Sequence, residues 1–302
     1  MRIYNPALGR FLSADPISSE YPWNSTYSFA ENDVIRCVDI DGLEKYYTIH
    51  GEYIGQVGTS TEIRVVNGNQ IRRWSLGSLQ EAVIGTGDRG RSGQYWINLL
   101  NDQSTVVPQI AFDALTDKAM LGPIADGIKQ SPTFTELITN MKPGVKISYS
   151  TTGTFTEDET GNIYILKGMS TQDQILGLTW ELTNSANSER LNGLKTSAVT
   201  RDDYIMGKLQ IEAEALLIRF QVEKEMGITN DPDASQFYGD INAYNVGAMT
   251  KHEITAKIRN WAYDEKSTQV NGKPVLLRDV YGKQYDDIQK NKKEEQKKDT
   301  AK

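Results

Sequence analysis

One predicted helix carries residues whose types and spacing could do acid–base chemistry. Ser170 or Thr171 can cap this helix, which extends to about residue 188. At about 100° per residue, Glu181 and Asn184 lie on the same polar strip of the helix. A glutamate oriented by a neighbouring amide can act as a general acid or base, so the strip could form the wall of a cleft. The alternative is an ordinary solvated helix face.

A second carboxylate, Glu212, lies in the next predicted helix, over residues 200–225. That helix has an apolar stripe consisting of Ile205, Leu209, Ala213, Leu216 and Phe220. Glu212 lies at the edge of the stripe, where a carboxylate is costly unless it is paired or functional. If the two helices are antiparallel neighbours, Glu181 and Glu212 could face each other and form an acid–base pair suited to hydrolysis. The alternative is that Glu212 pairs with Lys208 or Arg219 at helical spacing.

Three segments of this region form a recognisable pattern: GNIYIL at residues 161–166, ILGLTWELTN at 175–184 and IEAEA at 211–215. The pattern resembles the strand, first helix and glutamate-bearing second helix of HExxH metallopeptidase toxins. In that family two histidines four residues apart bind zinc, and the intervening glutamate activates water. Here Trp180 and Asn184 occupy the two histidine positions, and neither is an ordinary zinc ligand. The resemblance therefore implies the scaffold and the glutamate, and we expect no metal and no other cofactor.

The composition of the 302-residue chain excludes several classes of protein. Its formal net charge of −7 argues against an overall field that gathers nucleic acid, so we expect no nucleic-acid partner. No apolar run reaches the roughly 18 residues that a membrane span needs, so we predict no membrane span. The only cysteine, Cys37, cannot form an internal disulfide. The two histidines, His50 and His252, lie too far along the chain to replace the missing zinc pair.

Residues 1–44 are dense in aromatic residues and turn signals and differ from the rest of the chain. They contain RIYNPALGRFLSADP at 2–16, YSFAENDVI at 27–35 and VDIDGL at 38–43. This ordered pattern resembles the RHS repeat-associated core domain. In that family the module is the last piece of a β-cocoon, and a variable toxin follows it. The resemblance thus implies that the chain from about Glu44 onward is the C-terminal effector of a polymorphic toxin.

The same resemblance implies a self-cleavage site. By position, Asp39 and Asp41 would assist cleavage close to Leu43. Ile40 stands where the family usually has proline. The alternative is a structural turn in which the two aspartates cap backbone groups.

These residues must be positioned by an α+β fold. We expect a β-rich N-terminal segment followed by a mainly helical half. The resemblance to metallopeptidase toxins implies that the helical half contains a degenerate zincin-like strand–helix core. Strands are predicted at residues 46–49, 52–55 and 62–66. Helices are predicted at residues 110–128, 133–141, 170–188, 200–225 and 250–263. Residues 145–150 and 162–166 are predicted to form a hairpin, and residues 231–247 a loop. The expected domains are a core remnant at 1–44, an effector domain at 45–282 and a charged tail at 283–302 that is disordered or a frayed helix.

Taken together, these observations predict an interbacterial effector with a hydrolase-like, metal-independent site. We expect it to be produced in the bacterial cytoplasm and exported into a target cell by a secretion system such as a type VI apparatus. The expected partners are a cognate immunity protein and an RHS cocoon or another secretion-system carrier or adaptor. The alternative is a non-enzymatic toxin or interaction module that acts by binding and is also neutralised by an immunity protein.

Overall fold

The computed structural model describes residues 4–5, 10–11, 44–57, 61–66, 100–270 and 272–300. The chain divides into two compact units. The first comprises Met1–Phe112 and Lys118–Ala125, and the second comprises Asp113–Asp117 and Asp126–Lys302. The expected effector region, 45–282, is therefore shared between the two units.

The first unit contains a four-stranded mixed sheet with the strand order β4-β3-β5-β6. Its strands are β3 (Glu44–Thr48), β4 (Tyr53–Val57), β5 (Ile63–Val66) and β6 (Ser104–Val107). The first three confirm the predicted strands, whereas β6 was not predicted. Gly51, in the turn between β3 and β4, has a φ of 81°, and a Cβ there would lie 2.3 Å from the backbone carbon of Lys118. Only glycine fits this turn without strain. A separate two-stranded pair joins β1 (Tyr4–Asn5) to β2 (Arg10–Phe11).

The single helix predicted at 110–128 is broken in the structure. It consists of α3 (Gln109–Ala114), the short 3-10 helix η4 (Lys118–Met120) and α4 (Leu121–Gln130). The break arises because Leu115 forms a parallel bridge with Ile147, and the Thr116 N–H donates to the Ile147 carbonyl over 3.0 Å. Backbone groups used in this strand-like pairing are not available to an α-helix. The following helix, α5 (Pro132–Thr139), confirms the one predicted at 133–141 and is capped by Ser131.

The predicted hairpin between residues 145–150 and 162–166 is wrong. The structure forms a three-stranded sheet of order β7-β9-β8, from β7 (Ile147–Ser150), β8 (Phe155–Thr156) and β9 (Ile163–Leu166). Strand β9 pairs antiparallel with the short β8 and parallel with β7. The Asp-Glu-Thr-Gly turn at 158–161 therefore closes the β8–β9 hairpin, and β7 occupies the other edge of β9.

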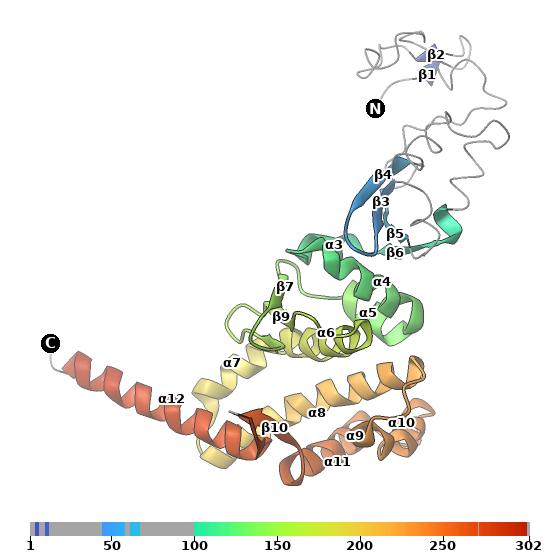
Figure 1. Cartoon of the computed structure of the whole chain (residues 1–302). Helices are drawn as coiled ribbons and strands as arrows, with labels where there is room; N and C mark the ends of the chain where they lie inside the picture. The colour runs from blue at the N-terminus through green and yellow to red at the C-terminus, as the bar shows by residue number, and fades with distance from the viewer. Residues whose placement is uncertain are drawn as a thin grey trace. The chain divides into compact units, whose positions relative to one another are not determined.

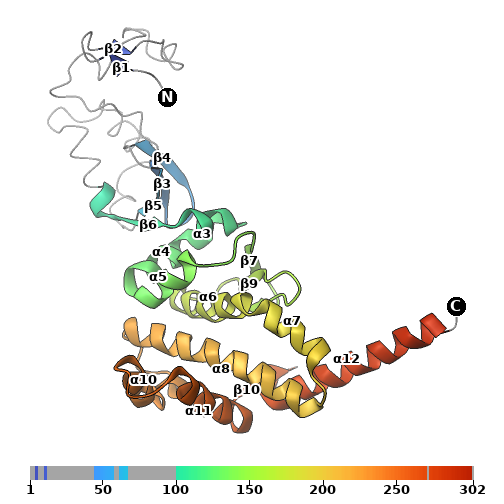
Figure 2. The same ribbon diagram turned by 180° about the vertical axis from the view of Figure 1, so that it is seen from behind.

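Three long helices of the second unit begin where the sequence predicts. They are α6 (Thr171–Ala186), α8 (Arg201–Glu225) and α11 (Lys251–Asp264), and α7 (Ser188–Ser197) follows α6 directly. Ser170 caps α6, and Thr200 and Thr250 form complete capping boxes. Both views show α8 lying between α6 and α11, and α8 also contacts α12 (Figures 1 and 2). The segment that carries Glu181 is thus packed against the one that carries Glu212.

The capping box of α8 supports a stability prediction. Thr200 Oγ1 accepts from the Asp203 N–H, and Asp203 accepts from the Thr200 N–H in return. Thr200→Ala removes the first of these bonds and should lower the free energy of unfolding by about 1 kcal/mol in urea titrations. Thr171→Ala, at an exposed position inside α6, is the matched control and should cause no comparable loss.

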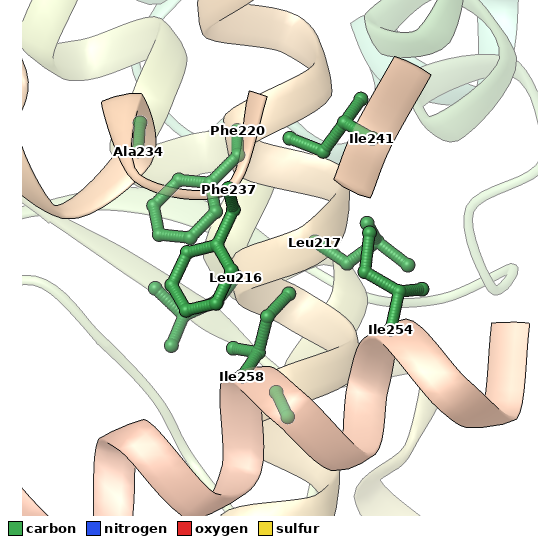
Figure 3. Packing of buried hydrophobic residues seen from close by; sticks show 9 residues of the cluster. Leu216, Leu217, Phe220, Ala234, Phe237, Ile241, Ile254 and Ile258 are labelled. Carbon is green, nitrogen blue, oxygen red and sulfur yellow. The ribbon is translucent and has the colours of Figure 1, made fainter. Parts of the chain in front are cut away.

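The loop predicted at 231–247 is also wrong, because two short helices form there. They are α9 (Pro232–Ser235) and α10 (Tyr238–Asn245). Asp231 caps α9 by accepting from the Asp233 and Ala234 N–H groups. Phe237 and Ile241 point into a core cluster shared with α8 and α11 (Figure 3). The apolar residues of this polar segment therefore fix it to the core, although they are too sparse to predict a helix. The buried members of the cluster are Ala213, Leu216, Leu217, Phe220, Ala234, Phe237, Ile241, Ile254 and Ile258.

The C-terminal tail predicted to be disordered or a frayed helix is the outer part of a continuous helix. After the hairpin of β10 (Ser267–Val270) and β11 (Lys273–Leu276), helix α12 runs from Leu277 to Thr300. Its first turns are anchored because Leu277 and Tyr281 join a buried cluster with Tyr204, Ile205 and Leu209 of α8. Its later turns extend beyond the other helices of the second unit (Figures 1 and 2).

The mixture of helices and small mixed sheets confirms the α+β class. Within the described ranges, every helix is too short or too polar to cross a bilayer.

Candidate functional site

Glu181 lies in the middle of α6 and faces the end of the small sheet. Its side chain is buried, with 7% of the residue's surface exposed. Oε2 accepts a hydrogen bond from Thr156 Oγ1 of β8 at 2.7 Å and one from Asn184 Nδ2 at 3.4 Å. Burial raises the pKa of the Glu181 carboxyl to about 7, and the charge of Glu212 adds to the rise. A carboxyl of this kind is half-ionised at neutral pH and can both accept and release a proton.

Asn184 lies one turn after Glu181 on the same face of α6 and is also buried. Its amide nitrogen is directed at Glu181, whereas its Oδ1 is buried without a hydrogen-bond partner. A buried unpaired carbonyl oxygen is uncommon and costs free energy. The structure therefore brings together the two residues that the sequence placed on one strip, and it leaves one acceptor beside the carboxyl.

Glu212 enters the same region from α8. Trp180 Nε1 donates to its Oε2 and the Tyr281 hydroxyl donates to its Oε1, both over 2.8 Å. Burial raises the pKa of Glu212, and the hydrogen bond from Tyr281 opposes the rise. The positive charge of Lys208 also favours the ionised form. The charge of Glu212 also acts on Glu181, so the two carboxyls interact electrostatically between the packed helices α6 and α8.

The alternative pairing of Glu212 with Arg219 does not occur. Arg219 instead donates to Glu223 at 2.7 Å and to Asp231 at 3.1 Å. Glu223 is fully buried, and burial raises its pKa to about 7. Arg219, Glu223 and Asp231 together join the end of α8 to the start of α9. This acidic cluster was not predicted from the sequence. Its signal in the sequence was an Arg–Glu pair at i, i+4 spacing near the end of the helix.

The residues at the two histidine positions do not fit a zinc ion. The Trp180 indole nitrogen can only donate a hydrogen bond, and it donates to Glu212. Asn184 directs its amide N–H, not an oxygen, at Glu181. In the ranges that the structure describes, no three residues of the types His, Cys, Asp or Glu are placed to hold a metal. We therefore derive no chemistry through a metal.

Two contributors to the site could not be found from the sequence. Thr156 lies 25 residues before Glu181, and Tyr281 lies 69 residues after Glu212. Neither separation corresponds to a helical or strand period, so no pattern links these residues to the glutamates. The sequence indicates for Trp180 only that it cannot bind zinc. In the structure its indole N–H donates directly to Glu212.

A surface groove of about 360 Å³ lies between α7 and α8. It is lined by Arg190, Gly193, Leu194, Ser197, Gly207, Gln210 and Ile211. None of the candidate residues lines this groove. Glu181 and Asn184 are buried and lie outside this groove.

No protein-family model, curated protein or solved structure matches this chain. The resemblances to RHS core domains and HExxH toxins accordingly rest on the residues quoted for them. Asp39, Asp41 and Leu43, the predicted self-cleavage residues, lie outside the described residues.

Proposed function

We propose that this chain is an interbacterial effector that hydrolyses its target with a metal-independent acid–base pair, Glu181 and Glu212. The observation that carries the proposal is the environment of Glu181, a buried carboxyl with a pKa of about 7 beside a second carboxyl. Burial of this kind costs stability, and it is common at sites where a proton must be transferred at neutral pH. The RHS-like N-terminal pattern supports delivery by a secretion system and neutralisation by an immunity protein.

The chemistry follows from the hydrogen bonds of the site. Ionised Glu181 takes a proton from water as the water oxygen bonds to the electrophilic atom of the substrate. The protonated carboxyl then returns the proton to the leaving group as the substrate bond breaks. Thr156 and Asn184 orient the carboxyl through Oε2, and the free Oδ1 of Asn184 can accept a hydrogen bond from the water. The net reaction is addition of water across the bond, with Glu181 regenerated.

Expression of the Glu181→Gln variant in a susceptible bacterium tests this proposal. The amide keeps the shape of the side chain but cannot carry the proton, so toxicity should fall by about 100-fold or more in plating assays. Glu189→Gln is the matched control, because Glu189 is exposed on α7 and makes only a surface contact with Lys142. This control should kill as efficiently as the unmodified chain.

Full toxicity of a folded Glu181→Gln protein would contradict the catalytic proposal and favour a toxin that acts by binding. Co-expression of the adjacent downstream gene product provides a separate test of the effector assignment. Rescue by that product is expected for either kind of toxin, and failure of any neighbouring product to rescue would argue against an effector with a cognate immunity protein.

A further inference from the structure

The C-terminal helix α12 contributes directly to the candidate site. Tyr281, in its second turn, is buried, and its hydroxyl donates to Glu212 Oε1 at 2.8 Å. The pKa of Tyr281 is raised by its burial and by Glu212, so the phenol keeps its proton at neutral pH and can act as a donor. One side-chain contact therefore connects the last helix of the chain to the acid–base pair.

The two carboxyls of the pair each receive two side-chain donors, but these are distributed differently over the carboxyl oxygens. Both oxygens of Glu212 accept a hydrogen bond, one from Tyr281 and one from Trp180. The indole N–H of Trp180 can donate a hydrogen bond but cannot accept one, so Oε2 of Glu212 must remain the acceptor of this bond. For Glu181, the hydrogen bonds from Thr156 and Asn184 both go to Oε2. Neither of these side-chain donors reaches Oε1 of Glu181, so a proton on that oxygen displaces neither of them.

Two charged residues beside Glu212 act on it in opposite directions. Lys208 of α8 is buried beside Glu212, and its ammonium lies 3.6 Å from Asp158 Oδ2 in the β8–β9 turn and 5.8 Å from the centre of the Tyr281 ring. Asp158 opposes ionisation of Glu212, whereas Lys208 favours it. Tyr204 of α8 also interacts with Tyr281 and is itself a neutral phenol, because burial raises its pKa. Of these neighbours, only Lys208 brings a positive charge, and it acts on Glu212.

We propose that Tyr281 and Trp180 are positioning residues that hold Glu212 as a permanent carboxylate, so that Glu181 alone gains and loses the proton. The pair then carries one negative charge when Glu181 is protonated, and repulsion from the Glu212 carboxylate opposes loss of the single proton from Glu181. The inference deepens the proposed function, since it assigns the two glutamates different roles in the same site. It also makes α12 a part of the site, through one hydroxyl group.

Titration of the glutamate carboxyls by ¹³C NMR on the full chain tests the assignment. Signals are identified by their loss in Glu181→Gln and Glu212→Gln. In the unmodified chain the Glu181 signal should titrate near pH 7, while Glu212 keeps the chemical shift of a carboxylate at that pH. In Tyr281→Phe the midpoint of Glu212 should rise by about one pH unit, because a hydrogen bond to the charged form is lost.

Tyr285→Phe is the matched control, since Tyr285 lies one turn later on α12 and its hydroxyl donates to the Val199 carbonyl at the surface. It should leave both midpoints unchanged. Trp180→Phe removes the other donor to Glu212 and should raise the Glu212 midpoint as Tyr281→Phe does, so a folding defect in one variant leaves the test intact.

Protonation of Glu212 at a higher pH than Glu181 would overturn the assignment, and so would equal titrations in Tyr281→Phe and Tyr285→Phe. These readouts do not depend on toxicity. The expected titrations combined with a fully toxic Glu181→Gln variant would retain the charge assignment and reject hydrolysis. Loss of toxicity in Glu181→Gln combined with equal Glu212 titrations in Tyr281→Phe and Tyr285→Phe would retain the acid–base site and reject the role of Tyr281.

Discussion

Glu181→Gln should raise the free energy of unfolding at pH 8 by about 3 kcal/mol. The Glu181 pKa is about 7 in the folded chain against a usual value of 4.5. Between these values the folded state holds a proton that the unfolded state has released, so stability falls as the pH rises from about 4.5 to about 7. Above that range the folded state bears the full cost of a buried charge, which a neutral amide removes.

Urea unfolding of the unmodified chain and the variant at two pH values measures this effect. The stabilisation should be present at pH 8 and nearly absent at pH 4.5, where both side chains are neutral. Glu223 also has a raised pKa, but it is present in both proteins, so its contribution cancels in the difference between their free energies of unfolding. Glu189→Gln, at the exposed position on α7, should change stability little at either pH. A variant that is equally destabilised at both pH values would show that the Glu181 carboxylate has a structural role instead.

Phe220→Ala should lower the free energy of unfolding by about 3–5 kcal/mol, as expected for a large aromatic side chain removed from a packed core. Phe220 has no exposed surface and is a member of the cluster in Figure 3, where it lies beside Phe237. Its ring is stacked on that of Phe237, with centroids 5.8 Å apart, and Phe237 in turn meets Trp261 edge-on. The cavity would therefore loosen the contacts between α8, α10 and α11 together.

Thermal or urea unfolding checks this prediction, with Val246→Ala as the control. Val246 is 80% exposed at the end of α10, and its truncation should cost less than about 0.5 kcal/mol. A loss of under about 1 kcal/mol in Phe220→Ala would mean that the cluster collapses around the cavity or is not the main core. Because α8 carries both Phe220 and Glu212, any loss of toxicity in this variant would be attributed to the fold and not to the site.

The candidate site was partly accessible to sequence reasoning. Glu181 and Asn184 are three residues apart on one helix, so helical geometry alone predicts that they share a face. The position of Glu212 depended on how two helices pack, and the sequence could offer this only as one of two alternatives. The donors that distinguish the glutamates, Tyr281 and Thr156, lie on other elements and have no fixed spacing from them.

By itself, the sequence determined the helices whose capping and terminating residues lie within one turn of the helix end that they stabilise. Thr200 and Thr250 cap their own helices, and Gly227 follows the end of α8 with a φ of 71°. Tertiary structure alone decided the parallel pairing of β7 with β9 and the break in the helix at Leu115. The physical reason is that capping is satisfied by neighbouring backbone groups, whereas strand partners and buried hydrogen-bond donors come from segments that meet only when the chain has folded.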